Sequence, residues 1–238
     1  MPAGALERAV ALMQRLSDGA SELSVAQLAD RAGMPTSTAY RLLGELAGHG
    51  LVARSADGTV SLGPRLVALG RSAEAGLQAR LVTPATPIMQ RLAEETSETV
   101  LLTAPCGLEA LALHVVEADV HSVRLSHAVL RRAPMHLGAS GKVLAAHLEA
   151  SERQRLIDAV SVPGLAEALE TIVSDGYVYT VAELDAGAAG VAAPILDRRG
   201  RLLAGLSIAG PAERIAADFQ DGVTAVMAAA RRIERAIA

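Results

Sequence analysis

The chain has 238 residues, of which 51% are hydrophobic but only 2% aromatic, and its formal net charge is −4. This length allows one large domain or two smaller ones, with cores built from Ala, Leu and Val. No apolar run approaches the roughly 20 residues that a membrane span needs, and a single Cys cannot form an internal disulfide, so we expect a cytoplasmic protein without membrane attachment. The acidic balance argues against a general nucleic-acid coat.

Residues 5–62 contain three helical patterns followed by a hairpin. Ser24 is a good N-cap, and Gln27 stands three residues later, as a capping box requires. Gly33 ends this helix and supplies the left-handed conformation of a sharp turn. A turn signal, Asp57-Gly58, then joins two short strands that begin near residue 51.

The helix after Gly33 has one apolar face and one open face. Thr36 or Ser37 is expected to cap it, and apolar residues recur at helical spacing at Ala39, Leu42, Leu43 and Leu46. The opposite face carries Ser37, Tyr40, Arg41 and Gly44. Small residues allow close approach to a major groove, and an Arg can pair either with a guanine edge or with a phosphate.

The order of cap, glycine turn, polar-start helix and hairpin predicts a winged helix-turn-helix rather than an αα-hairpin used only for packing. The expected DNA contacts are Thr36, Ser37, Thr38, Tyr40, Arg41 and, on the wing, Arg54. Residues 1–65 hold six Arg (8, 15, 31, 41, 54, 65) and six acids (7, 18, 22, 30, 45, 57), so their charges cancel. We therefore expect modest non-specific affinity and a reliance on dimerisation.

Residues 64–80 form a bridging helical segment, with Pro64 in its first turn. Pro84 and Pro87 are expected to break the helical pattern, and a new helix is expected over 88–96. Further on, strands are predicted over 99–104, 110–116, 121–126 and 202–209, and helices over 140–149, 151–159, 164–174 and 214–237. The fold class is α+β, with a five- to six-stranded antiparallel sheet and helices outside it.

In the run PMHLGASGKVLAA (134–146), a turn with two glycines opens an apolar helix. Ser140 or its neighbours are expected to cap this helix, and the free N–H groups of its first turn attract carboxylates. The alternative is a helix start with no further role. Lys142, one turn into the helix, either pairs with a ligand or is a solvated surface residue.

Nothing in the sequence indicates catalysis or a cofactor. Five histidines (114, 121, 127, 136, 147) match no compact metal-ligand spacing, and Cys106 has no motif around it. The sequence contains no GxSxG, no P-loop and no paired catalytic carboxylates. We therefore expect a protein that is not an enzyme and that binds no metal.

With these motifs, the chain resembles the isocitrate-lyase-regulator (IclR) family of bacterial transcription factors. The resemblance covers nearly the whole length through separate motifs in order, at 23–54, 62–70, 134–146, 176–187, 192–200 and 205–215. It implies a winged helix domain over 1–63, a linker helix over 64–83 and a GAF-like α/β effector-binding domain over 84–238. It also implies a homodimer or tetramer that reads a palindromic operator.

The resemblance further implies an effector site around the GASG turn. The backbone of Ala139 and Ser140 matches positions that bind a small carboxylate. The other implied positions around the pocket are Leu125, Ala133, Met135, Thr180, Ala188, Gly190, Ser207 and Ala209. Glu183 matches a family acid, for which we favour an orienting or structural role.

This chain departs from some relatives, which place an acid at 180, a thiol at 190 and a hydroxyl at 209, where it has Thr, Gly and Ala. The smaller and less polar wall predicts an aromatic or branched carboxylate as effector. The sequence thus predicts a DNA-binding regulator, expected to be a repressor, in which a small acid sets the spacing of two winged helices. The rivals are a sensor or enzyme with a vestigial helix-turn-helix, and a protein-interaction module.

Overall fold

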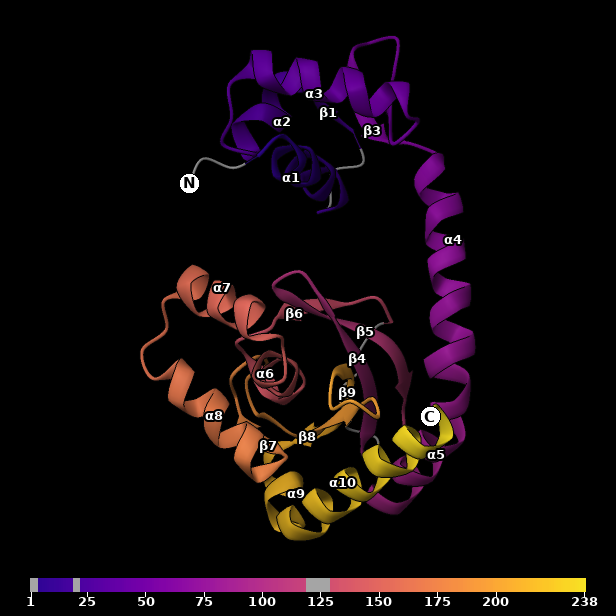
Figure 1. Cartoon of the computed structure of the whole chain (residues 1–238), viewed down its shortest axis with the longest axis vertical. Coiled ribbons are helices and arrows are strands. Elements are labelled where there is room, and N and C mark those ends of the chain that lie inside the picture. The colour runs from indigo at the N-terminus through magenta and orange to yellow at the C-terminus, as the bar shows by residue number, and fades with distance from the viewer. Residues whose placement is uncertain (1–3, 19–21, 119–128) are drawn as a thin grey trace. The chain divides into compact units, whose positions relative to one another are not determined.

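The computed structural model describes residues 4–18, 22–118 and 129–238 (Figure 1). The chain divides into two compact units, Met1–Leu77 and Gln78–Ala238. In the part that the structure describes, no helix combines the length and apolar character needed to cross a bilayer.

The first unit packs three helices against a small antiparallel sheet with strand order β1-β3-β2. The elements are α1 (Ala5–Ser17), β1 (Leu23–Ser24), α2 (Val25–Arg31), α3 (Thr36–Gly48), β2 (Val52–Arg54), β3 (Thr59–Leu62) and α4 (Arg65–Leu77). Leu12, Leu28 and Leu43 meet in a core that excludes solvent from all three side chains. This core fixes α3 so that its opposite face stays exposed.

The predicted start of α2 is confirmed at atomic level. The Ser24 hydroxyl accepts the Gln27 N–H at 3.3 Å, and Gln27 Oε1 accepts the Ser24 N–H at 3.0 Å. Gly33 has φ +61° after the helix, and Gly58 has φ +85° in the hairpin turn. Both positions use backbone conformations that favour glycine.

The expectation that Thr36 or Ser37 caps α3 is wrong. The helix already begins at Thr36, and the N-cap position belongs to Pro35. Pro35 has φ −58° and ψ 138°, and its carbonyl accepts the N–H groups of Thr38 and Ala39 at 3.0 and 3.1 Å. Because proline restricts φ, the extended residue falls one position earlier than the hydroxyl side chains.

The expected break at Pro84 and Pro87 is also wrong. After α4, which has no buried residue, comes a π-helical stretch, Gln78–Val82, and then α5 (Thr83–Thr96). Pro84 lies in the first turn of α5, directly after the π-helical stretch, and Pro87 lies inside the helix. The helix therefore begins five residues before the predicted position 88.

The second unit contains the predicted antiparallel sheet, with strand order β6-β5-β4-β9-β8-β7. Its strands are β4 (Thr99–Cys106), β5 (Glu109–Val116), β6 (Arg132–Pro134), β7 (Val178–Val181), β8 (Ala188–Leu196) and β9 (Leu202–Pro211). Its other helices are α6 (Gly138–Ala146), α7 (Ala150–Val160), α8 (Leu165–Asp175), α9 (Ala212–Ala217) and α10 (Phe219–Ala236).

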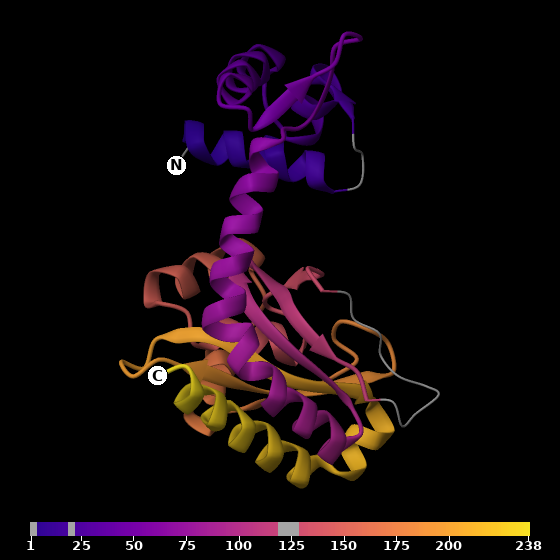
Figure 2. The same cartoon turned by 90° about the vertical axis from the view of Figure 1, so that its right-hand side faces the viewer.

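Helices cover both faces of this sheet. On one face, α5 and α10 lie side by side and bury Met89, Val226 and Ile233 (Figures 1 and 2). On the other face, α6 and α8 bury Leu144 and Leu169 in a second cluster. The start of α6 is thereby held against the sheet.

Two differences from the sequence-based expectation concern the second unit. The predicted helix 214–237 is two helices, because the chain turns at Asp218 and places Phe219 against Tyr179, with ring centroids 4.9 Å apart. Strands β6, β7 and β8 are absent from the prediction; β8 is rich in Ala and Gly, which have weak strand propensity. The predicted strand 121–126 lies outside the described residues.

Candidate functional site

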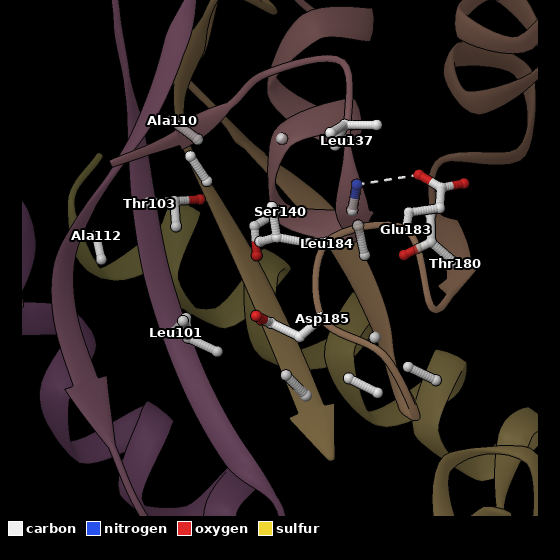
Figure 3. A pocket seen from close by; sticks show the side chains of 18 of the residues that line it. Leu101, Thr103, Ala110, Ala112, Leu137, Ser140, Thr180, Glu183, Leu184 and Asp185 are labelled. Atoms are coloured by element: carbon white, nitrogen blue, oxygen red, sulfur yellow. Dashed lines mark hydrogen bonds between the residues drawn. The ribbon is translucent and has the colours of Figure 1, made fainter. Parts of the chain in front are cut away.

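The second unit contains a pocket between the start of α6, the sheet and the loop 182–187 that joins β7 to β8 (Figure 3). Its cavity volume is about 90 Å³. We call it the α6 pocket. Residues around it include Leu101, Thr103, Ala110, Ala112, Arg131, Ala133, Leu137, Gly138, Ala139, Ser140, Gly141, Thr180, Ala182, Glu183, Leu184, Asp185, Ala188, Ala189, Gly190, Ile208 and Ala209.

Two glycines explain why α6 can begin here. Gly138 has φ +69°, a conformation that other residues rarely adopt. A Cβ on Gly141 would lie 2.8 Å from the Met135 carbonyl oxygen and 2.9 Å from that of Pro134. The spacing of the two glycines in GASG thus lets the first turn press against the end of β6.

The first turn of α6, which contains N–H positions without an intrahelical partner, lines the α6 pocket. The Gly138 N–H donates to Glu183 Oε2 at 3.0 Å, and Glu183 Oε1 pairs with Lys142 Nζ at 2.5 Å. Lys142 is therefore paired with Glu183 rather than solvated on the surface, and only 19% of its side chain is exposed. The N–H groups of Ala139 and Ser140 lie in the same first turn, where a helix offers them no acceptor. These contacts fit an orienting role for Glu183.

The Ser140 side chain has another role than the expected cap. Leu137 is the N-cap of α6 and no side chain caps the helix, whereas the Ser140 hydroxyl lies 2.7 Å from the Ser207 hydroxyl. Ser207 is 1% exposed, so it reaches the pocket through Ser140. In such a pair one hydroxyl donates to the other, and the accepting hydroxyl keeps its own hydrogen for a ligand.

Charged residues gather on one side of the α6 pocket. Arg131 Nη2 and Asp185 Oδ1 lie 3.3 Å apart, and Asp185 belongs to the 182–187 loop that also carries Glu183. The loop leaves β7 through Ala182, which has φ +53°. Elsewhere the wall consists mainly of Ala and Gly, so the pocket joins a small apolar space to a polar start of a helix.

Most of the expected effector positions come together around this pocket. Those that line it are Ala133, Ala139, Ser140, Thr180, Ala188, Gly190 and Ala209. Met135 does not line it, because its side chain is fully buried in the core beneath α6, and Ser207 stands behind Ser140. Leu125 lies outside the described residues.

Sequence reasoning missed the floor of the pocket and its loop. Leu101 and Thr103 of β4, and Ala110 and Ala112 of β5, alternate along two paired strands, with Thr103 opposite Ala112. That alternation is visible in the sequence, and a buried Thr in an apolar strand could have marked the face. The loop residues Ala182–Asp185 offer no comparable signal.

A second candidate surface lies on α3 in the first unit. Its exposed residues are Thr36, Ser37, Tyr40, Arg41, Gly44 and Glu45, which we call the α3 face. Thr38 is half-buried. Tyr40 is 54% exposed, and Arg41 Nη1 pairs with Glu45 Oε1 at 2.7 Å.

Arg54 joins the hairpin to this face. Its Nη2 donates to the Tyr40 carbonyl oxygen at 3.3 Å, and its guanidinium lies 5.7 Å from the centre of the Tyr40 ring. That distance is within the range of a cation–π contact. The structure thus brings the expected α3 residues and the expected wing arginine onto one surface.

Among the described residues, no cluster of His, Cys, Asp and Glu could hold a metal ion. Burial lowers the pKa of His114 and of His147, so both favour the neutral form. His147 Nδ1 lies 2.9 Å from the Val143 carbonyl oxygen, and Cys106 is exposed on β4. His121 and His127 lie outside the described residues.

Comparisons with known proteins match both units of the chain. The IclR helix-turn-helix domain matches residues 5–56, and the C-terminal domain of the bacterial transcriptional regulator IclR matches residues 77–235. The chain is 30% identical over 207 residues to the regulator KipR of Bacillus subtilis, covering 82% of each chain. It is 29% identical over 228 residues to the transcriptional repressor IclR of Escherichia coli, covering 90% of this chain and 82% of that one. An IclR homologue from Microbacterium hydrocarbonoxydans, solved with 4-hydroxybenzoate, has a TM-score of 0.67 at 26% identity over 98% of this chain and 99% of that one.

Proposed function

Because the chain belongs to the IclR family of bacterial transcriptional regulators, we propose that it is a cytoplasmic repressor whose binding to a palindromic operator is controlled by a small organic acid. The observation that carries the proposal is the α6 pocket, which the first turn of α6 lines together with residues that are mainly Ala and Gly. The repressor role is supported by the Escherichia coli relative, which is a transcriptional repressor.

The carboxylate of the effector would bind at the first turn of α6. The N–H groups of Ala139 and Ser140 and the positive end of the helix dipole favour an anion there. Glu183 already takes the Gly138 N–H, and Lys142 balances its charge, so a second carboxylate need not meet an uncompensated one. When Ser207 donates to Ser140, the hydrogen of the Ser140 hydroxyl supplies one further donor.

The rest of the effector would be a ring or a branched chain. Gly190 and Ala209 stand opposite each other on β8 and β9 and add little bulk to the wall. Isothermal calorimetry with benzoate, 4-hydroxybenzoate, 3-methylbutanoate, glyoxylate and pyruvate tests this. We expect binding of the ring or branched acids, weakened at least about tenfold in Ala209→Val, because a 1.4 kcal/mol loss is tenfold in affinity.

The matched control is Ala150→Val, which adds the same two carbons at an exposed position of α7 and should leave affinity unchanged. Binding of glyoxylate and pyruvate alone would show that the effector class is wrong. Equal weakening by both substitutions would show that the acids bind elsewhere.

DNA binding is proposed for the α3 face and the adjoining half-buried Thr38, with Thr36, Ser37, Thr38, Tyr40 and Arg41 in a major groove and Arg54 on the wing. Two copies in a homodimer or tetramer would read the two half-sites, and the effector would alter their spacing. The bounds 1–63, 64–83 and 84–238 are the domain limits that we propose for this division of labour.

An electrophoretic mobility shift assay with the DNA duplex upstream of the chain's own gene tests whether the chain binds DNA. Arg41→Ala should reduce binding at least about tenfold, within the ~1–3 kcal/mol that one base-reading arginine contributes. Arg232→Ala removes the same charge from an exposed position of α10 and should change little. If the wild-type chain binds no duplex, the vestigial alternative, a sensor or enzyme without DNA output, replaces the proposal.

A further inference from the structure

The α3 face carries an acid beside its arginine. Glu45 Oε1 lies 2.7 Å from Arg41 Nη1, and the side chains are 60% and 59% exposed. The two residues stand four apart on the helix and point to the same open side. Since a DNA duplex is lined with phosphates, an exposed carboxylate on this face opposes binding wherever it meets the backbone.

Helix stability does not account for Glu45. The residue lies in the last turn of α3, which ends at Gly48, and a negative charge is unfavourable at that end of a helix. The pair also runs in the weaker direction, with the cation N-terminal to the acid. An exposed ion pair of this kind contributes little to folding. The acid therefore calls for another explanation.

The chemistry of the pair supplies one. A guanidinium has five N–H donors, of which Glu45 takes one through Nη1, so the remaining donors can still form the two bonds that a guanine edge accepts. The pair as a whole is neutral, which reduces its attraction to a phosphate. Attraction to a guanine depends on the placement of the donors more than on net charge. Glu45 thus weakens the competing contact more than the specific one.

We propose that Glu45 is a specificity-determining residue that acts through Arg41, by keeping its guanidinium off the phosphates and directing it to a guanine. The inference rests on the proposed function, because it takes α3 as the helix that enters the major groove. It also decides between the two roles that the sequence left open for Arg41.

The test is a selection of duplexes from a random library by the full-length wild-type chain, repeated with Arg41→Ala, Glu45→Gln and Glu45→Ala. We expect the wild type to select a palindrome with a guanine in each half-site, and Arg41→Ala to lose the preference at that position alone. Both Glu45 variants should weaken the same preference, Glu45→Ala more, because Gln can still accept a bond from Arg41.

Binding constants complete the test, measured by fluorescence anisotropy with the selected duplex and a scrambled duplex at several salt concentrations. Glu45→Gln should tighten binding to the scrambled duplex about threefold to tenfold, and steepen its salt dependence by about 0.9 for each additional phosphate that the protein neutralises. The ratio of the two affinities should fall. Glu22→Gln, an equal charge change at an exposed residue outside α3, is the control and should preserve the ratio.

The outcomes separate this inference from the proposed function. Equal changes on both duplexes, or an unaltered guanine preference in both Glu45 variants, would overturn the role of Glu45 while leaving the DNA reading intact. Failure of the wild type to select any consensus would overturn the proposed function and, with it, the inference.

Discussion

Removing Arg214 should strongly destabilise the second unit, because Arg214 forms an ion pair with the buried Glu98. Glu98 immediately precedes β4 and has 7% of its side chain exposed, and its two oxygens accept bonds from Arg214 Nε and Nη2 at 2.6 and 2.8 Å. The carboxylate also packs against Gly210, where a Cβ would collide with it. In Arg214→Met the carboxylate would stay buried beside an apolar chain. Breaking a buried pair in this way costs about 3–5 kcal/mol.

The assay is urea unfolding followed by tyrosine fluorescence in a Tyr40→Phe background. The chain has three Tyr and no Trp, so Tyr177 and Tyr179 then report on the second unit alone. With a slope of about 1–3 kcal/mol per molar urea, the midpoint should fall by on the order of 2 M. Glu98→Gln leaves Arg214, 30% exposed, with access to water and should cost less.

The double variant Glu98→Gln, Arg214→Met provides the decisive comparison. It removes the buried charge, so it should be more stable than Arg214→Met alone, with a coupling free energy of about 1.5–3 kcal/mol. A loss below about 1 kcal/mol in Arg214→Met, or additive effects in the double variant, would refute the reasoning, because either result means that the pair is solvated like a surface pair.

Three further predictions concern other parts of the chain. Gly141→Ala should abolish binding of the acids in calorimetry and lower the melting temperature, since its Cβ would press on the Met135 carbonyl; unchanged binding would contradict the account of α6. Burial holds the pKa of His147 in the folded chain below its ordinary value of about 6.5. As the pH falls, the unfolded chain therefore binds a proton before the folded chain does. The stability that is present above about pH 6.5 is lost as the pH falls toward the folded pKa. His147→Gln should reduce the change of the urea unfolding midpoint between about pH 7.5 and 5.5. A change as large as that of the wild type would contradict the prediction. Ser24→Ala should destabilise the first unit by about 1 kcal/mol in thermal unfolding, because it removes the hydroxyl that accepts the Gln27 N–H. An unchanged stability would show that this hydrogen bond does not stabilise the unit.

The first unit could be predicted nearly in full because its signals are local. A serine cap, a glycine turn and an Asp-Gly hairpin each depend on a few neighbouring residues, and the structure has all three. The error at the start of α3 is local as well: Pro35 imposes the extended residue that Thr36 was expected to supply.

The second unit could be predicted less well because its remaining signals are not local. Strand β8 consists largely of Ala and Gly and becomes a strand only through pairing with β7 and β9. The pocket floor needs the register of β4 and β5, and the ion pair between Glu183 and Lys142 joins residues 41 positions apart. The family resemblance supplied most of the pocket positions, whereas the two-glycine turn indicated the start of α6 to within two residues.

The scarcity of side-chain bulk around the α6 pocket bears on how its selectivity could change over evolution or by design. Ala133, Ala188 and Ala209 are all on its wall, so a wider ligand range cannot be reached by trimming them much further. Enlarging any of them by one or two carbons, in contrast, subtracts from the space while retaining the backbone donors of α6. For the proposed acid effector, selectivity is therefore best altered by adding side-chain carbons, and the pocket is then a starting point for sensors tuned to progressively smaller acids.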